Sequence, residues 1–218
     1  MEISTSLLSV KKEDIIQTIY NLEVAHTDYF HIDVMDGRFV ENDTSETMRT
    51  YCEYLNQVTN LPIDVHLMVT NIKEYIDSYS IFNPNIITFH YEACKDDEEV
   101  DEYIKYVKER DCKVGLAIKP NTDIAQIVKF LPKINLLLIM SVEPGKGGQK
   151  FIKSIVEKIK CAKAKIDELN LETEIEVDGG INLDNSKDIK EAGATIAVSG
   201  TAIISSKDYK YIISKMKV

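Results

Sequence analysis

Short runs of β-branched and apolar residues recur along the 218-residue chain, and longer amphipathic segments separate them. Successive runs begin roughly 20 to 40 residues apart, which is the spacing of a strand followed by a helix. The segment 155–169, for example, has apolar residues at i, i+3, i+4 and i+7, a pattern typical of an amphipathic helix. We expect strands at the eight runs 2–8, 29–34, 63–68, 86–91, 113–118, 136–142, 174–179 and 195–200.

Eight consecutive strand–helix units most economically close into a (β/α)8 TIM barrel of the α/β class. A doubly wound open sheet is the alternative, but it usually carries a G-x-G-x-x-G turn after its first strand. This chain has no such turn there. We therefore expect residues 1–218 to form a single (β/α)8 barrel domain, because this length fits one large domain.

The charge balance and the cysteines restrict partners and location. The formal net charge of −10 disfavours nucleic acid and anionic membranes as partners, since both attract basic surfaces. No apolar run approaches the length of a membrane span, and the N-terminus lacks the layout of a signal peptide. The four cysteines show no CxxC spacing, which is typical of free thiols in a reducing cytosol. We expect a cytoplasmic protein.

The stretch YFHIDVMDGRF (29–39) places ionisable side chains inside an otherwise apolar strand. Strand alternation puts His31, Asp33 and Met35 on one face, and Ile32 and Val34 on the other. Burying an unpaired imidazole and carboxylate costs several kcal/mol, on the order of 2–7 for a polar group alone. The strand therefore predicts a partner for His31 and Asp33.

The ends of other strands supply candidates for that partner. His66 lies near the end of the third run, and Asp178 near the end of the seventh. In a TIM barrel these ends meet at the mouth where chemistry takes place. Two imidazoles and two carboxylates suit one divalent ion, whether Zn²⁺, Fe²⁺, Mn²⁺ or Co²⁺. The plainer interpretation of each residue alone is a satisfied core histidine or a loop-capping aspartate.

Three glycine-rich turns follow the last three strands. They are EPGKGGQ (143–149), DGG (178–180) and SGT (199–201). Glycine lets backbone N–H groups approach an anion closely. Because barrels commonly bind phosphate at this position, the turns predict a phosphate site.

Beyond these local features, the chain resembles the ribulose-phosphate 3-epimerase family along nearly its whole length. The matching stretches, in chain order, are ISTSLLS (3–9), FHIDVMDGRFV (30–40), IDVHLMV (63–69), ITFHYEA (87–93), GLAIKPNT (115–122), IMSVEPGKGGQKF (139–151), EIEVDGGIN (174–182) and VSGTAI (198–203). The resemblance implies a ribulose-phosphate-binding barrel and a metal-dependent epimerase of the pentose phosphate pathway. Such an enzyme interconverts D-ribulose 5-phosphate and D-xylulose 5-phosphate through an enediolate.

The resemblance also implies roles for individual residues. One divalent metal ion would be held by His31, Asp33, His66 and Asp178, with Asp33 and Asp178 as the two acid–base residues. The implied contacts to the sugar phosphate, a small-molecule partner, are Ser6, His66, Gly145, Gly147, Gly148, Gly179, Gly180, Gly200 and Thr201. Met35, Met68 and Met140 would shield the reacting carbon, and His90 and Glu92 would support the ligands. We also expect a homo-oligomer.

The match departs from the family at three places, and three alternatives stay open. The segment 41–47 lacks the family's proline, Thr5 stands where proline is common, and Lys146 replaces an aromatic residue.

One alternative function is a D-allulose 6-phosphate 3-epimerase of the same superfamily. Another is a metal-free barrel lyase that uses a lysine such as Lys119, and the third is a barrel that only binds its ligand.

Overall fold

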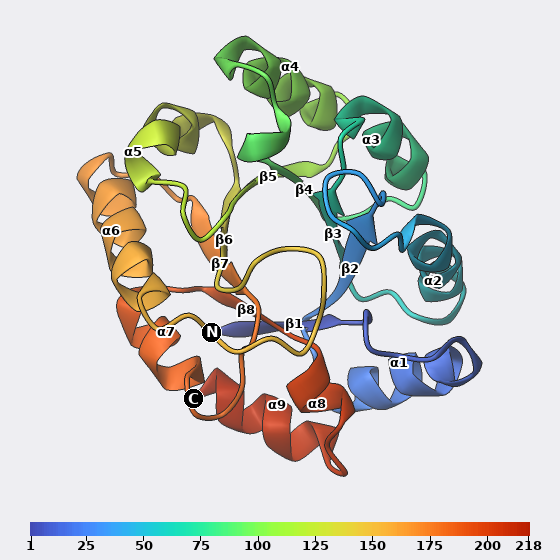
Figure 1. Cartoon of the computed structure of the whole chain (residues 1–218). Coiled ribbons are helices and arrows are strands. Elements are labelled where there is room, and N and C mark those ends of the chain that lie inside the picture. Colours follow the sequence, from blue (N-terminus) through green and yellow to red (C-terminus); the bar gives the residue numbers. More distant parts are fainter.

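The computed structural model describes residues 1–218 and has eight parallel strands closed into a barrel. The strands pair in chain order, and β8 returns to pair with β1. Figure 1 looks along the barrel, with the helices forming an outer ring. The strands are β1 (Glu2–Ser6), β2 (Tyr29–Met35), β3 (Ile63–Met68), β4 (Ile86–His90), β5 (Lys113–Ile118), β6 (Leu136–Met140), β7 (Glu174–Asp178) and β8 (Ile196–Ser199).

Every predicted strand is present, and no predicted boundary differs from the observed one by more than two residues. The (β/α)8 fold expected from the spacing is thereby confirmed. The largest differences are at β1 and β6, which end before the predicted runs do. At β7 the strand ends at Asp178 because Gly179 adopts a φ of 119°, which leaves the extended conformation.

The helices depart more from a regular pattern of one per strand. They are α1 (Ile15–Val24), α2 (Ser45–Val58), α3 (Ile72–Ser80), α4 (Asp97–Lys108), α5 (Ile124–Ile127), α6 (Ile155–Glu168), α7 (Ser186–Ala192), α8 (Thr201–Ile204) and α9 (Tyr209–Lys217). In the fifth unit α5 gives way to a 3-10 helix, Val128–Lys133, that contains Pro132. Proline has no N–H to donate, which disfavours continuation of an α-helix. The eighth unit is divided, and the Asp208 side chain caps the start of α9 by accepting from the Tyr211 N–H.

The strands carry two different faces, as the alternation predicted. Outward residues such as Ile32 and Val34 belong to the large apolar core between the strands and the helices. Inside the barrel, β4, β5, β6 and β8 contribute a small apolar cluster that includes Leu138 and Met140. The remaining strands contribute buried polar side chains, among them His31 and His66. Polar and apolar side chains are therefore both buried inside the barrel, and β4 contributes both kinds, with Ile86 in the apolar cluster and Thr88 and His90 among the buried polar groups.

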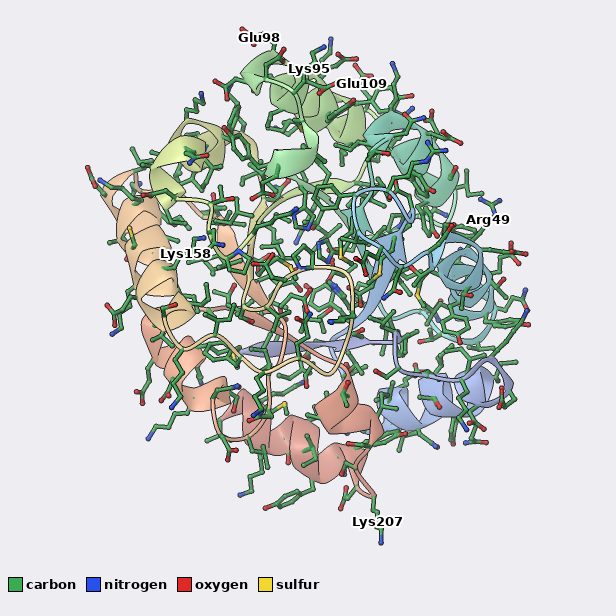
Figure 2. The ribbon with its side chains drawn as sticks, viewed as in Figure 1. Arg49, Lys95, Glu98, Glu109, Lys158 and Lys207 are labelled. Carbon is green, nitrogen blue, oxygen red and sulfur yellow. The ribbon has the colours of Figure 1, made fainter.

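Charged side chains lie mainly at the periphery, where Lys95, Glu109 and Lys207 project outward in Figure 2. None of the helices combines the length and the apolar character that crossing a membrane would require. The loop between β6 and α6 crosses over the barrel mouth in Figure 1. This loop contains the glycine-rich stretch 143–149 and covers the site described next.

Candidate active site

A cavity of about 250 Å³ opens at the C-terminal ends of the strands. Asp33 and Asp178 line it together with Ser6. The other lining residues predicted from the sequence are Met35, Met68, Met140, Gly145, Gly147, Gly148, Gly179, Gly180, Gly200 and Thr201. The structure therefore gathers the predicted site residues around one cavity, apart from the two histidines. His31 and His66 have no exposed surface and lie beneath it.

The side chains of His31, Asp33, His66 and Asp178 converge so that one ligand atom from each lies within 4.8 Å of the others. Asp33 Oδ1 lies 3.4 Å from His31 Nε2 and 3.5 Å from His66 Nδ1. Asp178 Oδ2 lies 4.0 Å and 3.5 Å from the same two nitrogens. Ligands about 2.1 Å from a tetrahedral ion lie about 3.4 Å apart. The spacing of these four atoms therefore fits a divalent ion.

The two histidine nitrogens that face the carboxylates are buried without a hydrogen-bond partner. These atoms are His31 Nε2 and His66 Nδ1. A buried polar atom without a partner is costly, on the order of 1–3 kcal/mol. Both atoms are potential metal ligands, and a bound ion would remove that cost. The donor set and its unpartnered atoms thus fit the ion that the sequence predicted.

The electrostatics of the cluster favour positive charge among the four side chains. Burial alone would lower the pKa of His31, but the Asp64 and Asp33 carboxylates raise it well above its ordinary value. Burial also opposes ionisation of Asp33, yet the contacts with His31 and His66 lower the pKa of this carboxyl. Two carboxylates beside two imidazoles carry the charge that a divalent cation offsets.

Each histidine uses its second nitrogen to contact a different buried group. His66 Nε2 lies 2.9 Å from His90 Nε2, and His90 Nδ1 lies 3.1 Å from Glu92 Oε2. Glu92 Oε1 accepts hydrogen bonds from the Lys119 N–H and the Thr122 hydroxyl. His90 and Glu92 therefore back His66 rather than join the four ligand atoms, as the sequence analysis expected.

His31 is backed by residues that the sequence analysis missed. Its Nδ1 lies 2.5 Å from Asp64 Oδ2, and the Ser4 hydroxyl donates to the same oxygen at 3.0 Å. Glu176 is also fully buried here, and burial together with the Asp64 charge raises the pKa of its carboxyl well above the ordinary value. The available signal was alternation, because Asp64 and Glu176 each stand two residues before a predicted ligand on the same strand face.

The mouth of the cavity is shaped by hydroxyls and by the glycine turns. Ser6 Oγ donates to Asp33 Oδ2 at 2.7 Å, which fixes the aspartate that lines the cavity. Gly180 has a φ of 68°, and a Cβ there would lie 2.6 Å from the Phe151 backbone nitrogen. Only glycine fits this close approach between the turn after β7 and the loop after β6. Thr201 lies beside Ser9, with their hydroxyls 3.2 Å apart.

The segment 41–47, where the chain departs from the family, forms part of the rim. Helix α2 already begins at Ser45, so only the first residues of the segment are loop. The Asn42 side chain donates to the Gly145 carbonyl at 2.6 Å. Lys119 does not line the cavity, and its Nζ lies 4.2 Å from the centre of the Phe39 ring. This position offers no support for a lysine-dependent lyase.

Comparisons with known proteins agree on family and fold. The model of the "Ribulose-phosphate 3 epimerase family" matches residues 2–204. A ribulose-phosphate 3-epimerase of Escherichia coli K12 is 36% identical over 99% of this chain and 94% of its own length. One of Bacillus subtilis 168 is 36% identical over 100% of this chain and 98% of its own.

Solved structures with low sequence identity share the barrel. A crystal structure of 3-hexulose-6-phosphate synthase has a TM-score of 0.73 at 13% identity, covering 100% of this chain and 98% of its own. A structure of Mycobacterium tuberculosis tryptophan synthase has a TM-score of 0.68 at 10% identity, covering 99% of this chain and 90% of its own. At such identities the likeness concerns the fold.

Proposed function

The chain belongs to the ribulose-phosphate 3-epimerase family, and on that premise we propose that it interconverts D-ribulose 5-phosphate and D-xylulose 5-phosphate. The observation that carries the proposal is the pair Asp33 and Asp178. Both side chains line the cavity, and both contribute an oxygen to the four-atom cluster with His31 and His66.

Inversion at C3 explains why two carboxylates are needed. The hydrogen next to a ketone is weakly acidic, so its removal needs a positioned base and stabilisation of the resulting enediolate. One carboxylate, ionised, takes the proton from one face of the substrate. The other, protonated, returns a proton to the opposite face, and the roles reverse with the direction of reaction. Asp33 on β2 and Asp178 on β7 come from strands that are not neighbours in the barrel.

His31, Asp33, His66 and Asp178 would hold one divalent ion, which as a Lewis acid stabilises the negative charge of the enediolate. The remaining steps rest on the protein's own groups. Ser6 orients Asp33 through the hydrogen bond between their side chains. Met35, Met68 and Met140 are almost fully buried yet line the cavity, so they present apolar surface that excludes water from the reacting carbon.

The phosphate group would lie at the other end of the cavity, among the glycines of the turns after β6, β7 and β8. Gly147 and Thr201 approach each other there, since a Cβ on Gly147 would lie 3.8 Å from Thr201 Oγ1. Backbone N–H groups at glycine can approach an anion without interference from a side chain. Gly145, Gly148, Gly179, Gly180 and Gly200 complete the proposed subsite.

The test is epimerisation in D₂O with purified protein. We expect xylulose 5-phosphate to form with one solvent deuterium at C3, because the proton returned comes from a second acid. Product without solvent deuterium would contradict the two-base scheme. A parallel assay with allulose 6-phosphate decides between a pentulose and a hexulose substrate. Removing the metal with a chelator and adding back each candidate metal tests whether activity requires a divalent ion and which one.

Substitution of the two carboxylates tests their assignment. Asp33→Asn and Asp178→Asn should each lower kcat by at least about 10²–10⁴-fold, the range for loss of a single general acid or base. The control is Asp184→Asn, at an exposed aspartate that lies outside the cavity lining. Near-normal turnover in either site variant, with Asp184→Asn also active, would show that the pair is misassigned.

The assembly and the location of the protein are part of the same proposal. Helix α1 exposes Ile16, Tyr20 and Val24 by 52%, 63% and 55%, and these residues recur every four positions along one face. An apolar stripe of this kind supports a homo-oligomer. The cytoplasmic location is supported separately by the four cysteines, which are all free thiols. Light scattering on the purified protein measures the oligomeric state directly, and a monomer at all concentrations would contradict the proposed homo-oligomer.

A further inference from the structure

Beneath the four-atom cluster lies a second layer of buried polar side chains from different strands. Asp64 on β3 is 1% exposed, while His31 on β2, Ser4 on β1 and Glu176 on β7 have no exposed surface. Asp64 Oδ2 accepts hydrogen bonds from His31 Nδ1, at 2.5 Å, and from the Ser4 hydroxyl, at 3.0 Å. Removing a carboxylate from water is costly, so a carboxylate buried inside a barrel is expected to have a structural or functional role.

The contact with Asp64 determines which nitrogen of His31 carries the hydrogen and which one keeps a lone pair for the cluster. An ionised carboxylate only accepts hydrogen bonds, so His31 Nδ1 must carry the hydrogen and donate it. In the neutral imidazole the lone pair is then on Nε2, the atom that lies 3.4 Å from Asp33 Oδ1 and lacks a partner. Asp64 in turn cannot rotate freely, because the Ser4 hydroxyl holds the same oxygen.

The second layer contains its own candidate ligand set, since His31, Asp64 and Glu176 also bring three ligand atoms within 4.8 Å. The distance of 2.5 Å between His31 Nδ1 and Asp64 Oδ2 argues against an ion between them. Two ligands at about 2.0–2.2 Å from a tetrahedral ion are separated by about 3.4 Å. The contact is instead a short, direct hydrogen bond between the imidazole and the carboxylate.

We propose that Asp64 is a positioning residue for the metal site: it fixes the Nδ1–H tautomer and ring orientation of His31 so that Nε2 binds the ion. The inference rests on the proposed function, in which His31 is a metal ligand. Carboxylates that hold ligand histidines in this way are worth about 10–100-fold in metal affinity. His66 has a different support, because its second nitrogen meets the imidazole of His90 rather than a carboxylate.

The test measures zinc binding rather than turnover. Zinc affinity is determined by competition with a chromophoric chelator for the parent, Asp64→Asn and Asp64→Leu. We expect one zinc per chain in the parent, about 10-fold weaker binding in Asp64→Asn, whose amide oxygen still accepts a hydrogen bond, and up to about 100-fold weaker binding in Asp64→Leu. The matched control is Thr88→Val, at a buried hydroxyl that has no partner. It should bind zinc like the parent.

A second readout reports the tautomer itself. Long-range ¹H–¹⁵N correlation spectra of the zinc-loaded protein distinguish the two nitrogens of each imidazole, and only four histidines contribute. We expect His31 to show a protonated Nδ1 and a zinc-bound Nε2 in the parent. In Asp64→Leu the Nδ1 hydrogen should exchange faster with solvent. A merely structural role for Asp64 would change the unfolding temperature without changing these signals.

The outcomes separate the inference from the function. Zinc affinity of Asp64→Leu within about twofold of the parent, or a zinc-bound Nδ1 at His31, would overturn the role of Asp64 while leaving the epimerase proposal intact. Two zinc ions per chain would overturn it as well, because the second layer would then hold an ion. A parent that binds no zinc and gains no activity from any divalent ion would overturn the proposed function and the inference together.

Discussion

At the scale of single residues, Glu92 is the end of the chain of contacts that begins at His66. It lies beside His90 Nδ1 and accepts from the Lys119 N–H and the Thr122 hydroxyl. Burial opposes its ionisation, but the hydrogen bond from His90 and the other donors lower the pKa of Glu92 to about 2. The Glu92 carboxylate, with three hydrogen-bond donors, therefore links the end of β4 to the loop after β5.

We expect Glu92→Gln to lower the free energy of unfolding of the metal-free protein by about 1–3 kcal/mol at pH 7, because one amide oxygen cannot serve all three donors. The folded-state pKa of Glu92 lies below its ordinary value, so its contribution is present above pH 4.5 and is lost toward pH 2. The difference from the parent should therefore narrow by about 1 kcal/mol between pH 7 and pH 4. Urea unfolding at both pH values measures it.

The control for this prediction is Glu98→Gln, at an exposed glutamate in the first turn of α4 (Figure 2). It should change the unfolding free energy by less than about 0.5 kcal/mol. A Glu92→Gln protein as stable as Glu98→Gln at pH 7, or a deficit that grows with acid, would show that the Glu92 contacts do not stabilise the fold.

The candidate metal ligands show how much of a site can be predicted from the sequence. Alternation and the TIM-barrel rule correctly predicted that His31, Asp33, His66 and Asp178 converge. They gave the face of each side chain but not its neighbour on the adjacent strand. The contact between His31 and Asp64 depends on the register of β2 against β3, where His31 pairs with Asp64. No spacing within one strand contains that register.

At the scale of elements, strand prediction succeeded because the outward face of every strand packs into the large apolar core beneath the helices, which keeps alternate strand residues apolar. Helix prediction was less complete, since the 3-10 segment with Pro132 and the divided eighth unit depend on local caps and packing. The interior of the barrel imposes a further constraint. On adjacent strands Gly115 pairs with Thr88, and a Cβ on Gly115 would lie 2.0 Å from Thr88 Oγ1.

Gly115→Ala should therefore lower the free energy of unfolding by about 1–3 kcal/mol, the usual cost of overpacking a core. Thr88→Ala in the same protein should restore part of the loss, since it removes two of the three closest atoms. The control is Gly147→Ala, where the nearest atom would be 3.6 Å away. Chemical unfolding of the parent, Gly115→Ala, Thr88→Ala and the double variant gives the coupling energy between the two positions. Strictly additive effects would show that a side chain at position 115 does not clash with Thr88.

At the scale of the whole molecule, the charge distribution opposes the function proposed for the site. The formal net charge is −10, and the proposed substrate is a phosphate ester with about two negative charges. The acidic protein repels this substrate at long range. Any compensation has to be local, and Lys146 is the lysine that lines the cavity, within the loop that crosses its mouth.

We expect Lys146→Ala and Lys146→Phe to raise KM several-fold at low ionic strength with little change in kcat. A charge pair near 4 Å is worth about 1 kcal/mol in water, and the phosphate is remote from C3, so it is held alike in the ground and transition states. The increase should shrink as salt screens the charges. Lys150→Ala is the matched control, because Lys150 is exposed on the same loop but does not line the cavity. If the Lys146 variants and Lys150→Ala share the KM of the parent at every salt concentration, Lys146 is a solvated surface residue and takes no part in binding the phosphate.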